Sequence, residues 1–158
     1  MTTASELQAN KDLAVGWLLN LNEGRIDEML ATTADDWQMH GGPPQLPTGP
    51  DGIRALIAHI GPIDQTWTIL DVIGEGDRVV VRALNTCVQD SFFGLPAAGI
   101  RQVFTATFTF RISDGLVHEI FRNADDLGRV LQLGVTFALP HHSPDHSPQS
   151  TSPMSLTH

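Results

Sequence analysis

The sequence predicts a single α+β domain, because its apolar residues change from a helical spacing to a strand-like alternation partway along the chain. Up to residue 62, apolar side chains recur every three or four positions, as on one side of an amphipathic helix. From residue 66 to residue 123 they alternate with polar side chains, as in half-buried strands, and a last helical pattern follows. The predicted order is helices first, then a run of antiparallel strands, then a terminal helix. A parallel α/β fold would instead alternate strands and helices along the chain.

Three helices are predicted in the N-terminal part, over residues 5–22, 25–32 and 50–60. Ser5 is expected to cap the first helix. The apolar side of this helix is formed by Leu7, Ala14, Trp17, Leu18 and Leu21. Pro50 suits the first position of the third helix, and Gly61-Pro62 ends it. Between the second and third helices, the Gly- and Pro-rich segment 35–49 breaks the pattern and is predicted to be a loop.

The strands are predicted to form two hairpins, over residues 66–89 and 99–123. The first hairpin turns within residues 74–77. The second turns at Asp114-Gly115, a pair that is typical of tight hairpin turns. The final helix, over residues 125–134, is expected to end at Gly134, because glycine readily adopts the left-handed conformation found just after helices.

Composition limits the possible functions. With 158 residues, 41% of them hydrophobic, the chain can bury one core of ordinary size. The net charge of -9 argues against nucleic acid as a partner, because phosphate backbones are bound by clustered positive charge. Cys87 is the only cysteine, so neither an intramolecular disulfide nor a cysteine metal cluster can form. No glycine-rich phosphate loop is present, and no nucleotide cofactor is expected.

The two ends of the chain carry no signal for export or for a membrane. No apolar segment is long enough to span a bilayer, so a cytoplasmic protein without membrane contact is expected. Residues 140–158 are rich in Ser, Pro and His and are predicted to be disordered, which leaves residues 1–139 as the domain. A solvated tail is preferred over a loose metal site for its histidines, which are His141, His142, His146 and His158.

Two adjacent carboxylates, Asp125 and Asp126, stand where the last strand gives way to the last helix. In a regular strand Asp125 shares a face with Phe121 and Asn123, whereas Asp126 points elsewhere and is the better helix cap. A carboxylate at the mouth of an apolar pocket has its pKa raised by desolvation, as a general acid/base working near neutral pH requires. Asp125 is therefore the candidate acid/base, with helix capping as the alternative reading.

Residues 92–134 carry several spaced motifs. These are Phe93-Gly94-Leu95-Pro96-Ala97-Ala98-Gly99, Arg111-Ile112 followed by Asp114-Gly115, Glu119 with Phe121, and Asp125 before Leu127-Gly128 and Gln132-Leu133-Gly134. In these motifs the chain resembles the SnoaL-like polyketide cyclases, a branch of the nuclear-transport-factor-2-like superfamily. The N-terminal half fits more loosely, through NEGRIDEM and ADDWQMH, so the resemblance covers the chain to about Gly134.

The resemblance implies a cone-shaped fold, in which a curved antiparallel sheet wraps round the N-terminal helices and encloses a deep apolar pocket. It also implies a dimer or tetramer formed through the outer face of the sheet. Cyclases of this kind close the last ring of an aromatic polyketide by intramolecular aldol condensation in secondary-metabolite biosynthesis, without metal or cofactor. An Asp of the final strand acts as their acid/base, and Asp125 falls at that position.

Six further residues are candidates for binding an apolar, polycyclic substrate. Asn123 and Arg111 are expected to hold enolate or carbonyl oxygens, and Arg82 is a weaker candidate for the same role. The other three are expected to line the pocket: His40, Trp37 and Phe121. Structural roles compete with these readings. His40 could instead bond loop carbonyls, and Arg111 could pair with Asp114 or Glu119 on the surface. Arg122 and His118 are expected on the outer face.

Departures from the family keep other functions open. Val88 or Gln89 stands where relatives commonly have a pocket His, and Arg122 stands where many have an acidic residue. Ketosteroid isomerase chemistry is disfavoured because the chain has no Tyr. Epoxide hydrolysis would need an Asp-Arg-Asp set, to which Asp125 and Arg111 or Arg82 could contribute. A role in hydroxylation and non-catalytic binding of an apolar ligand are the remaining alternatives.

Overall fold

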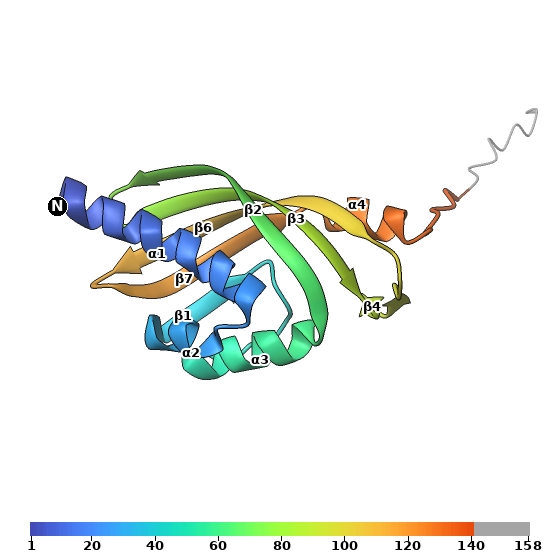
Figure 1. Ribbon diagram of the computed structural model, residues 1–158, viewed down its shortest axis with the longest axis horizontal. Coiled ribbons are helices and arrows are strands. Elements are labelled where there is room, and N and C mark those ends of the chain that lie inside the picture. Colours follow the sequence, from blue (N-terminus) through green and yellow to red (C-terminus); the bar gives the residue numbers. More distant parts are fainter. Residues whose placement is uncertain (141–158) are drawn as a thin grey trace, which may run out of the picture.

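The computed structural model describes residues 1–140. The predictions for the histidines of the tail, namely disorder and the less favoured metal site, lie outside the described residues. The fold is α+β, as predicted: a curved sheet wraps over the helices α1, α2 and α3, with α4 at the far end of the sheet from the N-terminus (Figure 1). The helices are α1 (Ala4–Glu23), α2 (Ile26–Ala31), α3 (Pro50–Ile60) and α4 (Asp126–Gln132). The strands are β1 (Thr33–His40), β2 (Ile63–Glu75), β3 (Arg78–Gln89), β4 (Ser91–Phe92), β5 (Leu95–Pro96), β6 (Gln102–Ser113) and β7 (Leu116–Ala124).

The main sheet is mixed rather than purely antiparallel. Its strand order is β1-β7-β6-β3-β2, and β1 runs parallel to β7 while the other pairs are antiparallel. The prediction of a loop from residue 35 was wrong over β1. Asp35 and Asp36 hide the alternation of this strand in the sequence, although Ala34 and Trp37 are buried against the core. Its partner lies some eighty residues later in the chain, so no local hairpin signal marks it.

Helix α1 lies against the concave face of the sheet and supplies Ala14, Trp17 and Leu18 to the core. Its cap is Thr3, two residues before the predicted Ser5. Thr3 Oγ1 accepts a hydrogen bond from the Glu6 backbone N–H at 3.1 Å, and Glu6 Oε2 accepts one from the Thr3 N–H at 2.7 Å. This reciprocal capping box satisfies two backbone donors that the helix cannot satisfy itself.

The predicted turns and helix ends are confirmed where local chemistry specifies them. Asp114 and Gly115 both have positive φ, 52° and 72°, as a two-residue hairpin turn of type I′ requires. Pro50 lies in the first turn of α3, and Gly61 follows its end. Gly134 adopts the left-handed conformation just after α4, with φ 88°. None of the helices among residues 1–140 is long and apolar enough to cross a membrane.

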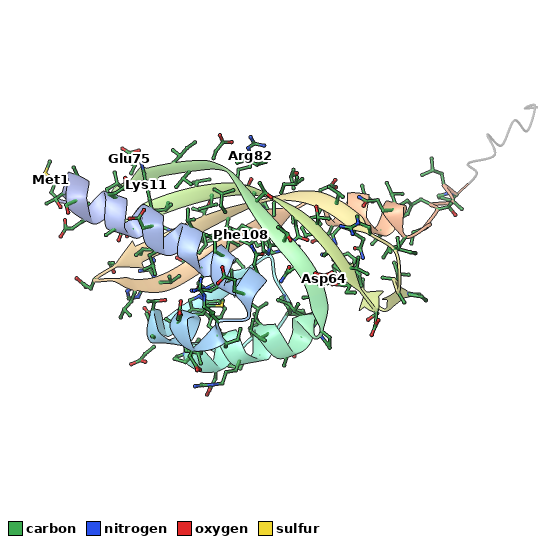
Figure 2. All side chains as sticks on the ribbon, in the orientation of Figure 1. Met1, Lys11, Asp64, Glu75, Arg82 and Phe108 are labelled. Atoms are coloured by element: carbon green, nitrogen blue, oxygen red, sulfur yellow. The ribbon has the colours of Figure 1, made fainter. Side chains whose placement is uncertain are left out.

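An aromatic cluster fills the core between α1 and the sheet. The Trp17 ring meets the Phe110 ring edge-on at 5.8 Å, and the Trp67 ring meets the Phe108 ring edge-on at 5.3 Å. Figure 2 shows Phe108 between the sheet and the helices, and Arg82 on the opposite, outer side. The concave face therefore holds the core, and any ligand cavity must open on this side of the sheet.

Strand β7 contains a bulge that decides which residues reach the concave face. Arg111 of β6 pairs with Glu119, but the next residue, Ile112, pairs with Val117, so His118 is an extra residue. Val117 is buried before the bulge, and Ile120 is buried after it. The alternation thus shifts by one residue, which carries the even-numbered residues that follow towards the inside.

Candidate active site

A cavity of about 650 Å³ lies between the concave face of the sheet and the surrounding helices. Its size is in the range of small-molecule sites. Its walls come from α1, α3, all five strands of the main sheet, the β4–β5 hairpin and α4. Its apolar surface comes from Trp17, Leu56, Ile60, Trp67, Phe104 and Phe108. A smaller hollow of about 320 Å³ is formed within residues 38–48 alone. We take the larger, apolar cavity as the candidate site, because polar groups from several elements converge on it.

Asp126 and Arg122 form an ion pair on the wall of this cavity. Arg122 donates from Nη1 to Asp126 Oδ2 at 2.8 Å and from Nη2 to Asp126 Oδ1 at 2.7 Å. The side chains are 17% exposed for Arg122 and 28% for Asp126. Arg122 Nη1 also donates to the Gly41 carbonyl at 3.2 Å. Two parallel hydrogen bonds fix the orientation of the carboxylate more firmly than a single contact would.

Gly41 lets the segment after β1 lie directly against β7. Its φ is 75°, and a Cβ at this position would collide with the carbonyl oxygen of Arg122. Glycine is therefore required both for the backbone conformation and for the close approach. The carbonyl of Gly41 reaches the Arg122 guanidinium because of this contact.

The structure exchanges the positions that the sequence predicted for the two carboxylates. Asp125 is exposed, does not line the cavity, and caps α4 by accepting a hydrogen bond from the Gly128 N–H at 2.8 Å. Gly128 has no Cβ, which leaves room for that carboxylate. Asp126, predicted to be the cap, faces the cavity instead. The bulge at His118 is the physical reason, and it also turns Arg122 inward, against the expectation that it lies on the outer face.

A second guanidinium, that of Arg129, is buried in the cavity wall with 5% exposure. It donates from Nε to Gln102 Oε1 at 3.0 Å, and Nη2 lies 3.7 Å from the Cys87 sulfur. Burial lowers the pKa of Arg129, although it stays a cation at neutral pH. Burial also raises the pKa of the Cys87 thiol, against the opposing effect of the Arg129 charge.

Amide and indole groups add further polarity to the cavity. Asn85 is fully buried and donates from Nδ2 to Gln65 Oε1 at 3.1 Å. Its Oδ1 atom, and the indole N–H groups of Trp17 and Trp67, have no hydrogen-bond partner among residues 1–140. A buried polar atom without a partner is costly, so these groups suit a ligand that supplies one.

The structure places the other predicted site residues away from the cavity. Trp37 is fully buried in the core, and its ring packs beneath α3. The remaining residues lie on the convex face of the sheet: Arg111, His40, Phe121, Arg82 and Asn123.

Ion pairs and stacking occupy most of these five side chains. Arg111 Nε donates to Glu119 Oε2 at 3.2 Å, which confirms the surface pairing considered for it. His40 Nε2 lies 2.9 Å from Glu119 Oε1, and its ring stacks on Phe121 at 4.4 Å. Arg82 Nε donates to Asp71 Oδ2 at 2.6 Å.

Glu119 should make the stability of the fold depend on pH. Burial alone would raise the pKa of this carboxyl, but hydrogen bonds from Arg111 and His40 and their charges lower it below its ordinary value. A lowered folded-state pKa means stabilisation that is present above the unfolded pKa, about 4.3, and is lost as pH falls through the folded value. Glu119→Gln should therefore destabilise the protein by about 1 kcal/mol at pH 7 and by much less at pH 3.

Urea unfolding of the wild type and Glu119→Gln at both pH values measures this difference. Glu75→Gln serves as the control, because Glu75 is exposed at the end of β2 and has no ion pair among residues 1–140. A deficit for Glu119→Gln that is equal at pH 7 and pH 3 would contradict the ion-pair explanation.

Fold and cavity together define a class of protein: a small α+β domain with an apolar cavity between its helices and a curved, open sheet. The model of the SnoaL-like domain matches residues 15–120. The chain belongs to this family, which is part of the NTF2-like superfamily. None of the curated proteins compared with the chain matches it significantly.

Several solved structures share the fold. TsrD from Streptomyces laurentii is 27% identical, with a TM-score of 0.70 over 80% of this chain and 96% of that one. IdmH from Streptomyces antibioticus, proposed to be a polyketide cyclase, is 25% identical, with a TM-score of 0.66 over 80% of this chain and 99% of its own. An LEH-like epoxide hydrolase from M. tuberculosis, 16% identical with a TM-score of 0.67 over 81% and 91% of the two chains, shows the fold alone.

Proposed function

We propose that the protein is a cofactor-independent enzyme of the polyketide cyclase type, which closes a ring by intramolecular aldol addition, with Asp126 as the acid/base. One observation carries the proposal. Asp126 is the only carboxylate on the wall of the apolar cavity among the described residues, and Arg122 holds it in place through two hydrogen bonds. A positioned carboxylate in a largely apolar cavity is suited to proton transfer.

In the proposed reaction, the Asp126 carboxylate removes a proton from a carbon that lies between two carbonyl groups. The resulting enolate carbon attacks a third carbonyl, elsewhere in the same substrate, which forms the new ring bond and an alkoxide. The protonated Asp126 returns the proton to that alkoxide, so the enzyme ends in its starting state. Arg122 keeps the carboxylate oriented and places positive charge beside the developing enolate oxygen.

The arrangement explains why Arg122 can stand where many relatives have an acidic residue. Arg122 reaches the cavity from β7, and the carboxylate is supplied four residues later, from the first residue of α4. In this proposal the acid/base residue therefore belongs to α4, whereas the family resemblance implied a residue of the final strand. The similarity to IdmH supports a cyclase, because that protein is itself proposed to be one.

Epoxide hydrolysis is a second candidate, favoured by the pairing of Arg122 with Asp126. In the Asp-Arg-Asp arrangement one carboxyl activates water while the other protonates the epoxide. Among residues 1–140, the cavity wall offers no second carboxylate to complete the set. Ring closure needs only one group to take and return a proton, so it fits the cavity better.

The test is turnover of a panel of anthraquinone-type keto-esters and the matching keto-acids by the wild type, followed by mass spectrometry and chromatography of the products. Binding is followed separately by quenching of tryptophan fluorescence, because Trp17 and Trp67 line the cavity. We expect ring-closed products of unchanged elemental composition, or of that composition less one water. Keto-esters and keto-acids that bind and are recovered unchanged would overturn the enzymatic proposal in favour of ligand carriage, and opening of matched epoxides would favour hydrolysis.

A further inference from the structure

Arg129 is a buried cation whose charge no carboxylate of the described residues neutralises by direct contact. Its side chain is 5% exposed and lies on the cavity wall. None of the ion pairs within residues 1–140 includes it. Burying a charge without a partner is expensive, so a cation kept in such a place needs an explanation.

Two phenylalanine rings hold the Arg129 guanidinium and determine how it can be approached. Its central carbon lies 3.5 Å from the centre of the Phe92 ring and 4.3 Å from that of the Phe104 ring. These contacts stabilise the cation and keep polar groups out of the two positions that the rings occupy. Phe92 comes from β4 and Phe104 from β6, which fixes the guanidinium from two separate elements.

On one edge of the guanidinium, the N–H donors already have acceptors. On the other edge, N–H donors remain free within the described part of the chain. Nε donates to Gln102, and Nη2 contacts the Cys87 sulfur, a weak acceptor. Nη1 has no hydrogen-bond partner among residues 1–140. A guanidinium has five N–H groups, so most of its donors are left for a ligand.

The charges on the cavity wall give the same indication. Arg122 and Asp126 neutralise each other through their two hydrogen bonds, which leaves Arg129 as an excess positive charge. The chain as a whole carries a net charge of -9. General attraction of anions would require a basic surface, and this protein is acidic. The excess positive charge is therefore a specific feature of the cavity.

We infer that the cavity binds an apolar, ring-containing carboxylate, with the carboxylate on the open edge of Arg129 and the rings against Phe104, Trp67 and Phe108. A carboxylate is planar and presents two oxygens at the spacing of two parallel guanidinium N–H groups. The inference uses the same cavity as the proposed function and adds the charge of the substrate to it. The substrate of the ring closure would accordingly be a free acid.

The first experiment compares two ligands of the same shape on the wild-type protein. Anthraquinone-2-carboxylate and anthraquinone-2-carboxamide differ in charge but hardly in size, and both can be titrated at pH 7.5 by tryptophan quenching or calorimetry. A charge-assisted pair with Arg129 should make the carboxylate bind roughly ten- to a hundredfold more tightly. Equal affinities, or tighter binding of the carboxamide, would overturn the inference without any variant being needed.

Variants of Arg129 then assign the preference to this residue. Arg129→Gln should bring the two affinities within about threefold of each other, and Arg129→Lys should restore part of the difference because it keeps the charge. Arg54→Gln is the control, since Arg54 is an exposed arginine on α3 that pairs with Asp51 outside the cavity. Near-ultraviolet circular dichroism checks that each variant is folded. A folded Arg129→Gln protein that keeps the full preference would show that another group binds the carboxylate.

These binding measurements separate the inference from the proposed function. Tight, charge-dependent binding of the anthraquinone acid would stand even if no keto-ester or keto-acid is turned over. Turnover of keto-esters with no preference for a carboxylate would instead support ring closure and remove the role proposed for Arg129.

Discussion

Replacement of Asp126 by Asn should reduce turnover by about 10²–10⁴-fold, the usual contribution of a general acid/base, while ligand binding changes little. The amide keeps the size of the side chain but cannot take a proton from carbon. Its oxygen can still accept one hydrogen bond from Arg122, so the side chain should remain near its present position. Turnover and tryptophan quenching, measured on the same preparations, distinguish loss of chemistry from loss of binding.

Asp125→Asn is the matched control, because it makes the same chemical change one residue earlier. Asn caps helices about as well as Asp, so the hydrogen bond from the Gly128 N–H should be kept and the protein should retain its stability. We expect turnover close to that of the wild type. If Asp125→Asn is inactive and Asp126→Asn is active, Asp126 is not the acid/base. Asp125, the residue predicted from regular strand alternation, would then hold that role.

The contrast between these two residues shows where sequence reasoning succeeded and where it stopped. The helices, the two hairpins and the Asp114-Gly115 turn follow from local signals, and the structure confirms them. Which face of the sheet a residue at the end of β7 points to depends on whether every earlier residue of the strand keeps its register with β6. One extra residue, His118, reverses that face, and nothing in the alternation of the sequence marks it.

Strand β1 was missed for a different reason. Its partner β7 is parallel and distant in sequence, and two consecutive residues of the strand, Asp35 and Asp36, are acidic and exposed. The resemblance to the SnoaL-like family gave the cone and the pocket, but it could not place individual side chains. Six of the seven predicted site residues therefore lie on the convex face or at a helix cap, and Trp37 lies in the core.

A signal for the observed site was nevertheless present in the sequence. Asp126 and Arg129 lie three residues apart in the predicted last helix, a spacing that brings side chains together on one side of a helix. Charged residues on the side of the last helix that must face the domain are unusual, since that side is normally apolar. Arg122 was interpreted as a charge on the outer face and Asp126 as the helix cap, and no role was predicted for Arg129, so their common direction was missed.

Two helical glycines should respond oppositely to the same substitution, Gly to Ala. Gly16 lies in α1, where a Cβ would have no neighbour within 4 Å, so Gly16→Ala should stabilise the protein by about 0.5–1 kcal/mol through the lower entropy of the unfolded chain. Gly52 lies in α3, where a Cβ would collide with the Pro47 carbonyl oxygen and come within 2.6 Å of the Trp37 ring. Gly52→Ala should cost about 3 kcal/mol, at the upper end of overpacking effects.

The cost at Gly52 should extend to the cavity, because neither obstacle can give way easily. The Pro47 oxygen belongs to the backbone, and Trp37 is fully buried, so α3 itself must move away from β1. The same helix supplies Leu56 and Ile60 to the cavity wall. Urea unfolding should therefore show opposite shifts for the two variants, and only Gly52→Ala should weaken binding of anthraquinone-2-carboxylate. If both alanine variants are stabilised, the contact of α3 with Trp37 is looser than the structure shows, and the cavity is not held in shape by that helix.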